Sequence, residues 1–360
     1  MIGDLVNNAS GGDGECLRNV KVIESSDEPA MRCLAMVRLS SVAAAPSPWR
    51  LVKSFLVLLT SAFFLLLLTS SRRPVQKLPR RMQERLAWLR RVCEEMPVPS
   101  EVAAAAMDEA TRLRTQVLED HQLMVCVVFK AGSTTWNSIL AHHYNNTEVL
   151  KTKKFYKLLE VLNPTKERFR EVSRSPLFLK ALMARHPLER LLSAYRDRIE
   201  DQTHVTSQAR EYGPQILRHT RGLSFSRKHM FHINGTLRVV PTFREFVSYL
   251  VSRPPQEYDP HWRPVSLQCG LCHINYTAVV LTETYNEDLH YIMRASGMDQ
   301  LVDMTLLTKN NNRGKGNTHS LLQQYYSTLE PSLLQKIISV YQNDFKMFNY
   351  TAGAILGRVS

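Results

Sequence analysis

A lysine, a glycine and three hydroxyl residues follow a short apolar run in the middle of the chain. The run, residues 123–129, has the length and composition of a buried parallel strand. After Phe129 come Lys130, Ala131, Gly132, Ser133, Thr134 and Thr135, and then an amphipathic helix predicted to reach about Tyr144. Unpaired N–H groups at a helix start, aided by the helix dipole, bind anions. The loop is therefore predicted to hold a phosphate-like group, with Lys130 as an added cation.

A second strand and helix repeat this arrangement further along the chain. Residues 177–184 are predicted to form the strand, and residues 185–190 lead into a helix, with Pro187 in a first turn that tolerates proline. Arg185 at the strand end and Ser193 on the helix can both reach a single phosphate, the arginine through its planar fork. Two phosphate sites on adjacent strand ends are predicted, and Glu189 and Arg190 are expected to make mainly structural contacts.

The competing enzyme class is a P-loop nucleotide kinase. Its phosphate loop needs G-x-x-x-x-G-K-[ST], with the lysine after the second glycine. Here Lys130 precedes Gly132, and no strand-ending Mg²⁺-binding aspartate is evident. The kinase interpretation also leaves the segment 185–196 unexplained.

These two segments resemble the Golgi carbohydrate sulfotransferases, in the branch with the chondroitin and dermatan 4-O-sulfotransferases and the sulfotransferase that makes the natural killer cell glycan epitope. Phe129-Lys-Ala-Gly-Ser-Thr-Thr-Trp136 is similar to that family's 5′-phosphosulfate loop, and Arg185-His-Pro-Leu-Glu-Arg-Leu-Leu-Ser-Ala-Tyr-Arg196 to its 3′-phosphate element. Further matches lie at residues 243–247, 261–262, 269–273 and 341–350, so the likeness covers about residues 120–350.

The resemblance implies a fold, a donor and a set of site residues. The fold would be α/β and P-loop-like, a central parallel sheet flanked by helices. The donor would be 3′-phosphoadenylyl sulfate (PAPS), without a metal, and Lys130 would be the catalytic cation. The donor would be bound by Phe129, Lys130, Ala131, Gly132, Ser133, Thr134, Thr135, Arg185, His186, Pro187, Leu188, Glu189, Arg190, Leu191, Leu192 and Ser193.

Three residues depart from the family pattern. Phe129 stands where a proline is usual, His186 where an acidic residue is usual, and Ser133 where a cysteine is common. None of the three removes Lys130, Thr134, Arg185 or Ser193, so activity is expected. A glycan hydroxyl also needs a general base. The candidates are His142 and His143, with Glu148, Glu160 and His261 as alternatives.

The elements before the loop are predicted to place the enzyme on a membrane. Residues 51–70 are apolar apart from Lys53 and reach about 30 Å as a helix, enough to span a bilayer. The predicted order is a cytoplasmic tail (1–50), a transmembrane signal anchor (51–70), a stem (71–121) and a luminal domain (122–360). The stem is expected to hold helices at 83–95 and from Ser100 to about 120. This describes a single-pass type II Golgi protein.

Orientation rests on sequons and cysteines, against the charge rule. Basic residues are denser after residue 70 than before residue 51, which alone favours a cytosolic domain. Four sequons follow the anchor, at Asn145, Asn234, Asn275 and Asn349. Four cysteines follow it too, and of three possible pairings Cys93–Cys126 with Cys269–Cys272 is preferred. Zinc on Cys269, Cys272, His273 and His261 is the alternative.

The net charge of +13, from 46 basic and 33 acidic side chains, predicts an anionic partner. The basic excess lies beyond residue 70, because acidic side chains balance the basic ones in residues 1–50. By resemblance the acceptor is an acidic glycan, sulfated at the 4-hydroxyl of N-acetylgalactosamine in chondroitin or dermatan. Terminal glucuronic acid, N-glycan N-acetylgalactosamine and an inactive glycan-binding protein remain open; nucleic acid is not expected. Candidate glycan contacts are Lys151, Lys153, Lys154, Lys157, Arg196 and Arg198.

Overall fold

The computed structural model describes residues 77–201, 205–222, 232, 239–300 and 318–353, with isolated positions at 49, 56, 57, 59 and 60. Contacts divide the chain into two units, Met1–Thr69 and Ser70–Ser360. The predicted tail (1–50) and anchor (51–70) lie outside the described residues apart from those isolated positions. Among the described residues, no helix has both the length and the apolar character needed to cross a membrane.

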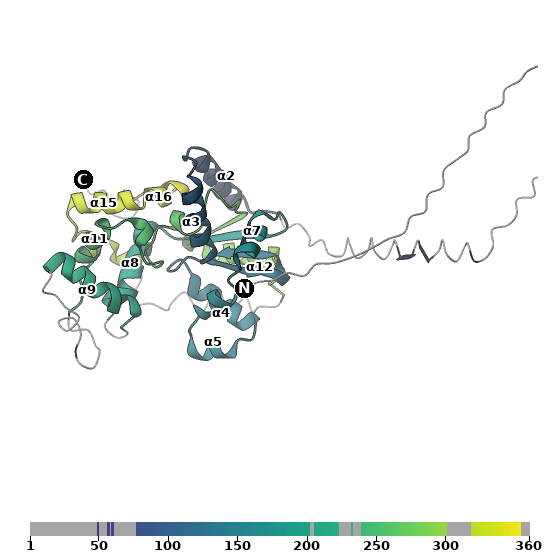
Figure 1. Ribbon diagram of the computed structural model, residues 1–360, viewed down its shortest axis with the longest axis horizontal. Coiled ribbons are helices and arrows are strands. Elements are labelled where there is room, and N and C mark those ends of the chain that lie inside the picture. Colours follow the sequence, from purple (N-terminus) through teal and green to yellow (C-terminus); the bar gives the residue numbers. More distant parts are fainter. Residues whose placement is uncertain are drawn as a thin grey trace, which may run out of the picture. The chain divides into compact units, whose positions relative to one another are not determined.

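A four-stranded sheet, ordered β1-β2-β3-β4, forms the centre of the second unit (Figure 1). β2 (Leu123–Cys126), β3 (Leu179–Ala184) and β4 (Ala278–Leu281) are parallel, as predicted. β1 (Thr115–Leu118) pairs antiparallel with β2, so the sheet is mixed and the prediction of a wholly parallel sheet is wrong at this edge. The helix expected to reach about residue 120 ends at Arg112, because the buried residues 115–118 pair with β2 instead.

The segment predicted as a stem is largely part of the folded unit. Helix α2 (Arg80–Glu94) buries Met82, Leu86, Leu89 and Val92 in the same core as the sheet. Helix α3 (Glu101–Arg112) begins after Ser100, whose Oγ accepts a hydrogen bond from the N–H of Ala103. With β1 in the sheet, the domain boundary predicted at residue 121 is too late.

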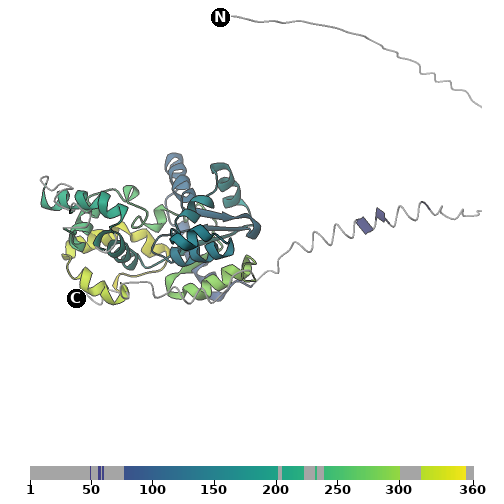
Figure 2. The same cartoon turned by 90° about the horizontal axis from the view of Figure 1, so that it is seen from below.

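Helices cover the sheet and build a second apolar core beside it (Figure 2). The first core carries α4 (Ser133–His143), α5 (Thr147–Thr152), α6 (Lys157–Val161), α7 (Lys166–Arg174) and α12 (Tyr285–Ala295). The second is built largely from α8 (Pro187–Tyr195), α9 (Ser207–Arg221), α11 (Phe243–Val251), α14 (Thr318–Tyr326), α15 (Pro331–Val340) and α16 (Gln342–Met347). A π-helix, η2 (Arg196–Glu200), continues α8. Short 3₁₀ turns are η1 (Glu119–His121), η3 (Pro255–Glu257), η4 (Val265–Leu267) and η5 (Thr282–Thr284).

The disulfides join elements far apart in sequence. Cys93 pairs with Cys272 and Cys126 with Cys269, with Cα–Cα distances of 5.3 and 5.9 Å. The preferred pairing, Cys93–Cys126 with Cys269–Cys272, is therefore wrong. Cys269 and Cys272 lie in one loop between the end of α2 and the end of β2, so each reaches a different element. Both sulfurs are used, which removes the thiolates that the zinc alternative required.

Candidate active site

A cavity of about 650 Å³ lies where β2, β3 and β4 end. Ligand sites of open α/β sheets lie outside the carboxyl ends of the strands. The cavity is lined by Phe129, Lys130, Gly132, Ser133, Thr134, Thr135, Arg185, Glu189, Ser193, Asp197, Arg198, His261, Thr282, Glu283 and Tyr285. The structure thus brings together the two segments that the sequence singled out, and adds residues after β4 and from the loop around residue 261.

The first loop has a backbone that only part of the sequence tolerates. Lys130 and Gly132 both have left-handed backbones, with φ of 69° and 92°. A Cβ at Gly132 would lie 2.2 Å from Cε2 of Tyr285, whose hydroxyl donates to the Gly132 carbonyl at 2.6 Å. The glycine is therefore required twice, by its φ and by the ring against it. Helix α4 begins directly after it, so its first N–H groups and three hydroxyl side chains meet at the cavity.

Lys130 is held by a carboxylate that the sequence did not single out. Its Nζ lies 3.1 Å from Oδ2 of Asp197, and Arg198 approaches the same oxygen at 2.9 Å. Burial lowers the pKa of Lys130, while Asp197 opposes that shift. Burial by itself raises the pKa of Asp197, but Lys130 and Arg198 outweigh it and hold that pKa below its usual value. Asp197 follows Ser193 by one helical turn, and that spacing was the available signal.

Arg185 and Ser193 line the same cavity from β3 and α8. Arg185 pairs with Glu189 at 3.1 Å and its Nη1 points to the Lys130 carbonyl at 3.4 Å. Glu189 therefore faces the cavity, contrary to a purely structural role. The guanidinium stands beside the first loop, so one anion bound there can meet groups from both strand ends.

The other residues predicted to bind the donor face away from the cavity. Arg190 is buried, and it donates to the carbonyls of Phe129, Pro260 and Arg263 at 3.0, 2.9 and 2.8 Å. His186 is buried against Phe345 and Tyr350 and faces the Thr351 carbonyl at 3.2 Å. The remainder pack in the interior or begin a helix: Ala131, Pro187, Leu188, Leu191 and Leu192. These residues support the site without lining it.

The predicted general bases, His142 and His143, lie at the far end of α4 from the loop. His142 is exposed, and His143 contacts His121 with 2.9 Å between the two Nε2 atoms. Neither lines the cavity, and neither do the alternatives Glu148 and Glu160. The alternative His261 does. Sequence reasoning ranked it low because it lies far from both motifs in the chain.

His261 has the surroundings of a general base. Its Nδ1 lies 2.6 Å from Oδ1 of Asp259, which also accepts from the His261 N–H at 2.8 Å. Burial lowers the pKa of His261, and Asp259 partly offsets that shift. An acceptor on Nδ1 favours the neutral tautomer with its lone pair on Nε2. That form can take a proton from a hydroxyl in the cavity.

Three predicted sequon asparagines, Asn145, Asn275 and Asn349, are exposed, and Asn234 lies outside the described residues. Among the residues that the structure describes, no cluster of three or more His, Cys, Asp or Glu side chains could bind a metal ion.

Comparison with known proteins agrees with this geometry. A sequence model of the sulfotransferase family matches residues 114–351. The chain belongs to the sulfotransferase family. The matched region of this sulfotransferase starts just before β1, in accord with the earlier domain boundary that the sheet requires.

Its relatives are carbohydrate sulfotransferases. Carbohydrate sulfotransferase 11 of Rattus norvegicus is 27% identical over 310 residues, covering 78% of this chain and 82% of the relative. Carbohydrate sulfotransferase 14 of Danio rerio is 27% identical, covering 73% and 69%. Carbohydrate sulfotransferase 9 of Homo sapiens is 29% identical, covering 66% and 53%. No solved structure gave a significant match. The protein is a carbohydrate O-sulfotransferase, and glycan sulfation is its activity.

Proposed function

We propose that this sulfotransferase moves the sulfuryl group of PAPS to the 4-hydroxyl of N-acetylgalactosamine in chondroitin or dermatan chains. The observation that carries the donor assignment is the cavity itself. It joins Lys130 and the α4 N-terminus, suited to a 5′-phosphosulfate, with Arg185 and Ser193, suited to a 3′-phosphate. Family members generally use this donor, which fits the two anion sites.

Each polar group has a place in the transfer. His261 takes the proton from the acceptor hydroxyl, whose oxygen forms the new O–S bond in line with the S–O bond that breaks. Lys130 and the first N–H groups of α4 stabilise the negative charge that develops on the departing 5′-phosphate oxygen. The leaving group is 3′-phosphoadenosine 5′-phosphate (PAP). Arg185 and Ser193 hold its 3′-phosphate through both steps.

An acidic chain as acceptor is supported by charge. The basic excess exceeds what one nucleotide requires. Of the six basic residues predicted to contact glycan, Arg198 lines the cavity, while Arg196 pairs with Glu200 at 3.9 Å. The four lysines lie on and around α5 and α6: Lys151, Lys153, Lys154 and Lys157. Terminal glucuronic acid and N-glycan N-acetylgalactosamine are the alternative acceptors.

We place the enzyme in the Golgi as a single-pass type II protein, anchored in the lipid bilayer by residues 51–70. Two disulfides and three exposed sequon asparagines support an oxidising, luminal compartment. Glycosidase treatment of the full-length protein tests this placement. A mass shift that disappears when Asn145, Asn275 and Asn349 are changed to Gln is expected; an unglycosylated protein exposed to cytosol contradicts it.

The function is tested with the full-length protein in detergent, using PAPS labelled in its sulfate. Chondroitin, desulfated chondroitin, dermatan and desialylated N-glycans are offered as acceptors, and the products are digested to disaccharides. Label at the 4-position of N-acetylgalactosamine is the expected result. Label on another sugar corrects the acceptor. Glycan binding without transfer of label would favour the inactive glycan-binding alternative.

A further inference from the structure

The side chain before Lys130 makes contacts that its usual replacement cannot make. Phe129 lines the cavity, and its ring stacks on the imidazole of His261 with 4.5 Å between centroids and 19° between planes. The guanidinium of Arg114 also lies over the Phe129 ring, 5.0 Å from its centroid. The proline that is common at this position in the resembling family has no aromatic face. This chain has therefore gained a contact between the loop of the catalytic lysine and the base.

The imidazole of His261 is fixed on two sides. Asp259 fixes its Nδ1 edge, and Gln208 donates to the second oxygen of Asp259 at 3.3 Å. Phe129 covers one ring face. Within the described part of the chain, no hydrogen bond from Nε2 to a protein group is found, so this atom is free for the acceptor hydroxyl. Rotation of the ring would break the carboxylate contact and the stacking contact together.

The charged groups around the base are mostly cationic. Lys130 and Arg198 face His261 from the cavity and act against its protonation. Arg114 and Arg263 lie on the side of Asp259, which is the one carboxylate that favours the imidazolium. Phe129 excludes water from this cluster at one face of the imidazole. Loss of the ring would hydrate His261 and relieve part of its burial.

We propose that Phe129 is a positioning residue that sets the orientation of the His261 imidazole relative to Lys130. Because the two residues are adjacent in the chain, the position of the leaving-group cation and the position of the base are linked through one backbone segment. This inference rests on the proposed role of His261 in sulfate transfer. It predicts that the ring, and not merely an apolar side chain, is needed at residue 129.

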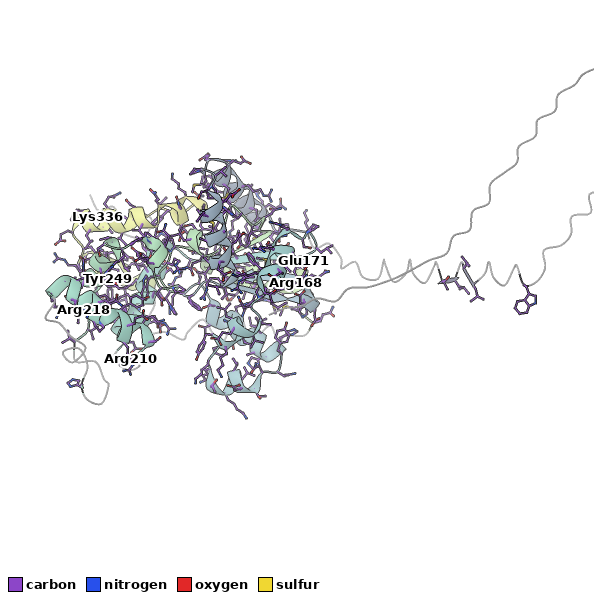
Figure 3. All side chains as sticks on the ribbon, viewed as in Figure 1. Arg168, Glu171, Arg210, Arg218, Tyr249 and Lys336 are labelled. Atoms are coloured by element: carbon purple, nitrogen blue, oxygen red, sulfur yellow. A yellow bond between two sulfur atoms is a disulfide. The ribbon has the colours of Figure 1, made fainter. Side chains whose placement is uncertain are left out.

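The test compares Phe129→Leu with Phe129→Tyr and with a matched control. Phe178 is a second buried phenylalanine under an arginine, Arg168, at 5.4 Å. Figure 3 places Arg168 on α7, away from the helical part that carries Tyr249 and Arg218. Phe178→Leu therefore removes a similar pair outside the cavity. Thermal melting of all three variants establishes that each is folded.

For Phe129→Leu we expect kcat to fall roughly tenfold, as part of a general-base contribution, with the donor KM unchanged. The acidic limb of the kcat/KM profile should move to higher pH, because hydration raises the pKa of His261 and a base must be deprotonated to act. Phe129→Tyr, which keeps the ring, should recover most of the loss.

NMR titration of the His261 ring, assigned with a His261→Gln variant, gives a readout that needs no turnover. The His261 titration should move to higher pH in Phe129→Leu and stay in place in Phe178→Leu. The same titration and the same pH profile in both leucine variants would overturn the proposal. If the titration moves but no sulfate is transferred even by the wild type, the positioning contact stands and the proposed function fails.

Discussion

The two strand-to-helix junctions of the cavity look alike in sequence but are built differently. The junction from β2 to α4 uses two left-handed residues and a lysine whose partner, Asp197, comes from another element. The junction from β3 to α8 uses an arginine paired with Glu189 on its own helix. A lysine is a mobile point charge, and arginine presents a fixed fork. The first junction is thus suited to charge that develops during reaction, and the second to a phosphate that stays unchanged.

The largest effect should come from Lys130→Ala. The loss of a donor aimed at the leaving oxygen costs roughly 10²- to 10³-fold in kcat. Steady-state transfer of labelled sulfate measures this, and circular dichroism checks the fold. Lys157→Ala is the matched control, since Lys157 also pairs with a carboxylate, Glu148, but lies outside the cavity. A Lys130→Ala enzyme with wild-type kcat would remove the difference between the junctions.

The second effect concerns the backbone of the first junction. Gly132→Ala combines a left-handed alanine, about 1–2 kcal/mol, with a clash against the buried Tyr285 ring, about 1–3 kcal/mol. Chemical denaturation should show the sum, and donor affinity should fall as the loop shifts. Gly222→Ala has a similar φ, 101°, with nothing within 4 Å of the new Cβ, so it should show the backbone cost alone.

Equal losses in the two glycine variants would mean that the Tyr285 contact is unimportant. A double variant, Gly132→Ala with Tyr285→Ala, separates the terms further. It should regain donor affinity relative to Gly132→Ala alone, because the ring no longer obstructs the methyl group.

The local parts of both junctions were predictable, and the long-range parts were not. The apolar runs of β2, β3 and β4 and the helix starts after Gly132 and His186 are encoded within a few residues. β1 was missed because four buried residues after an Ala-rich helix give no period of their own. The disulfide pairing and the choice of His261 depend on which loop packs against the strand ends. No spacing in the sequence records that packing.

The third effect tests the second junction. Arg185→Ala should raise the donor KM roughly tenfold or more while kcat changes less, since a charge-assisted pair to the 3′-phosphate is about 1.5–3 kcal/mol. Ser193→Ala should act in the same direction by a smaller factor. Isothermal titration with PAP measures the binding part directly.

Arg190→Ala is the contrasting variant on the same helix. Arg190 is buried and holds three backbone carbonyls, so its loss should lower the free energy of unfolding by about 3–5 kcal/mol. If Arg185→Ala instead lowers stability and leaves donor saturation unchanged, the 3′-phosphate assignment is wrong.

The smallest effect should come from Asp197→Asn. Its carboxylate lies 3.1 Å from Lys130, in a cavity proposed to bind a polyanion, so donor and product must compete with it for the lysine. Removing one negative charge at a partly exposed site should tighten PAP binding by roughly three- to tenfold, with the gain shrinking as salt is added. Product release should slow, so kcat should fall even though affinity rises. Glu148→Gln, which removes the carboxylate of the exposed pair with Lys157, should leave both quantities unchanged. Weaker PAP binding in Asp197→Asn would show that the carboxylate positions Lys130 for the donor instead of competing with it, and the first junction would then be as preorganised as the second.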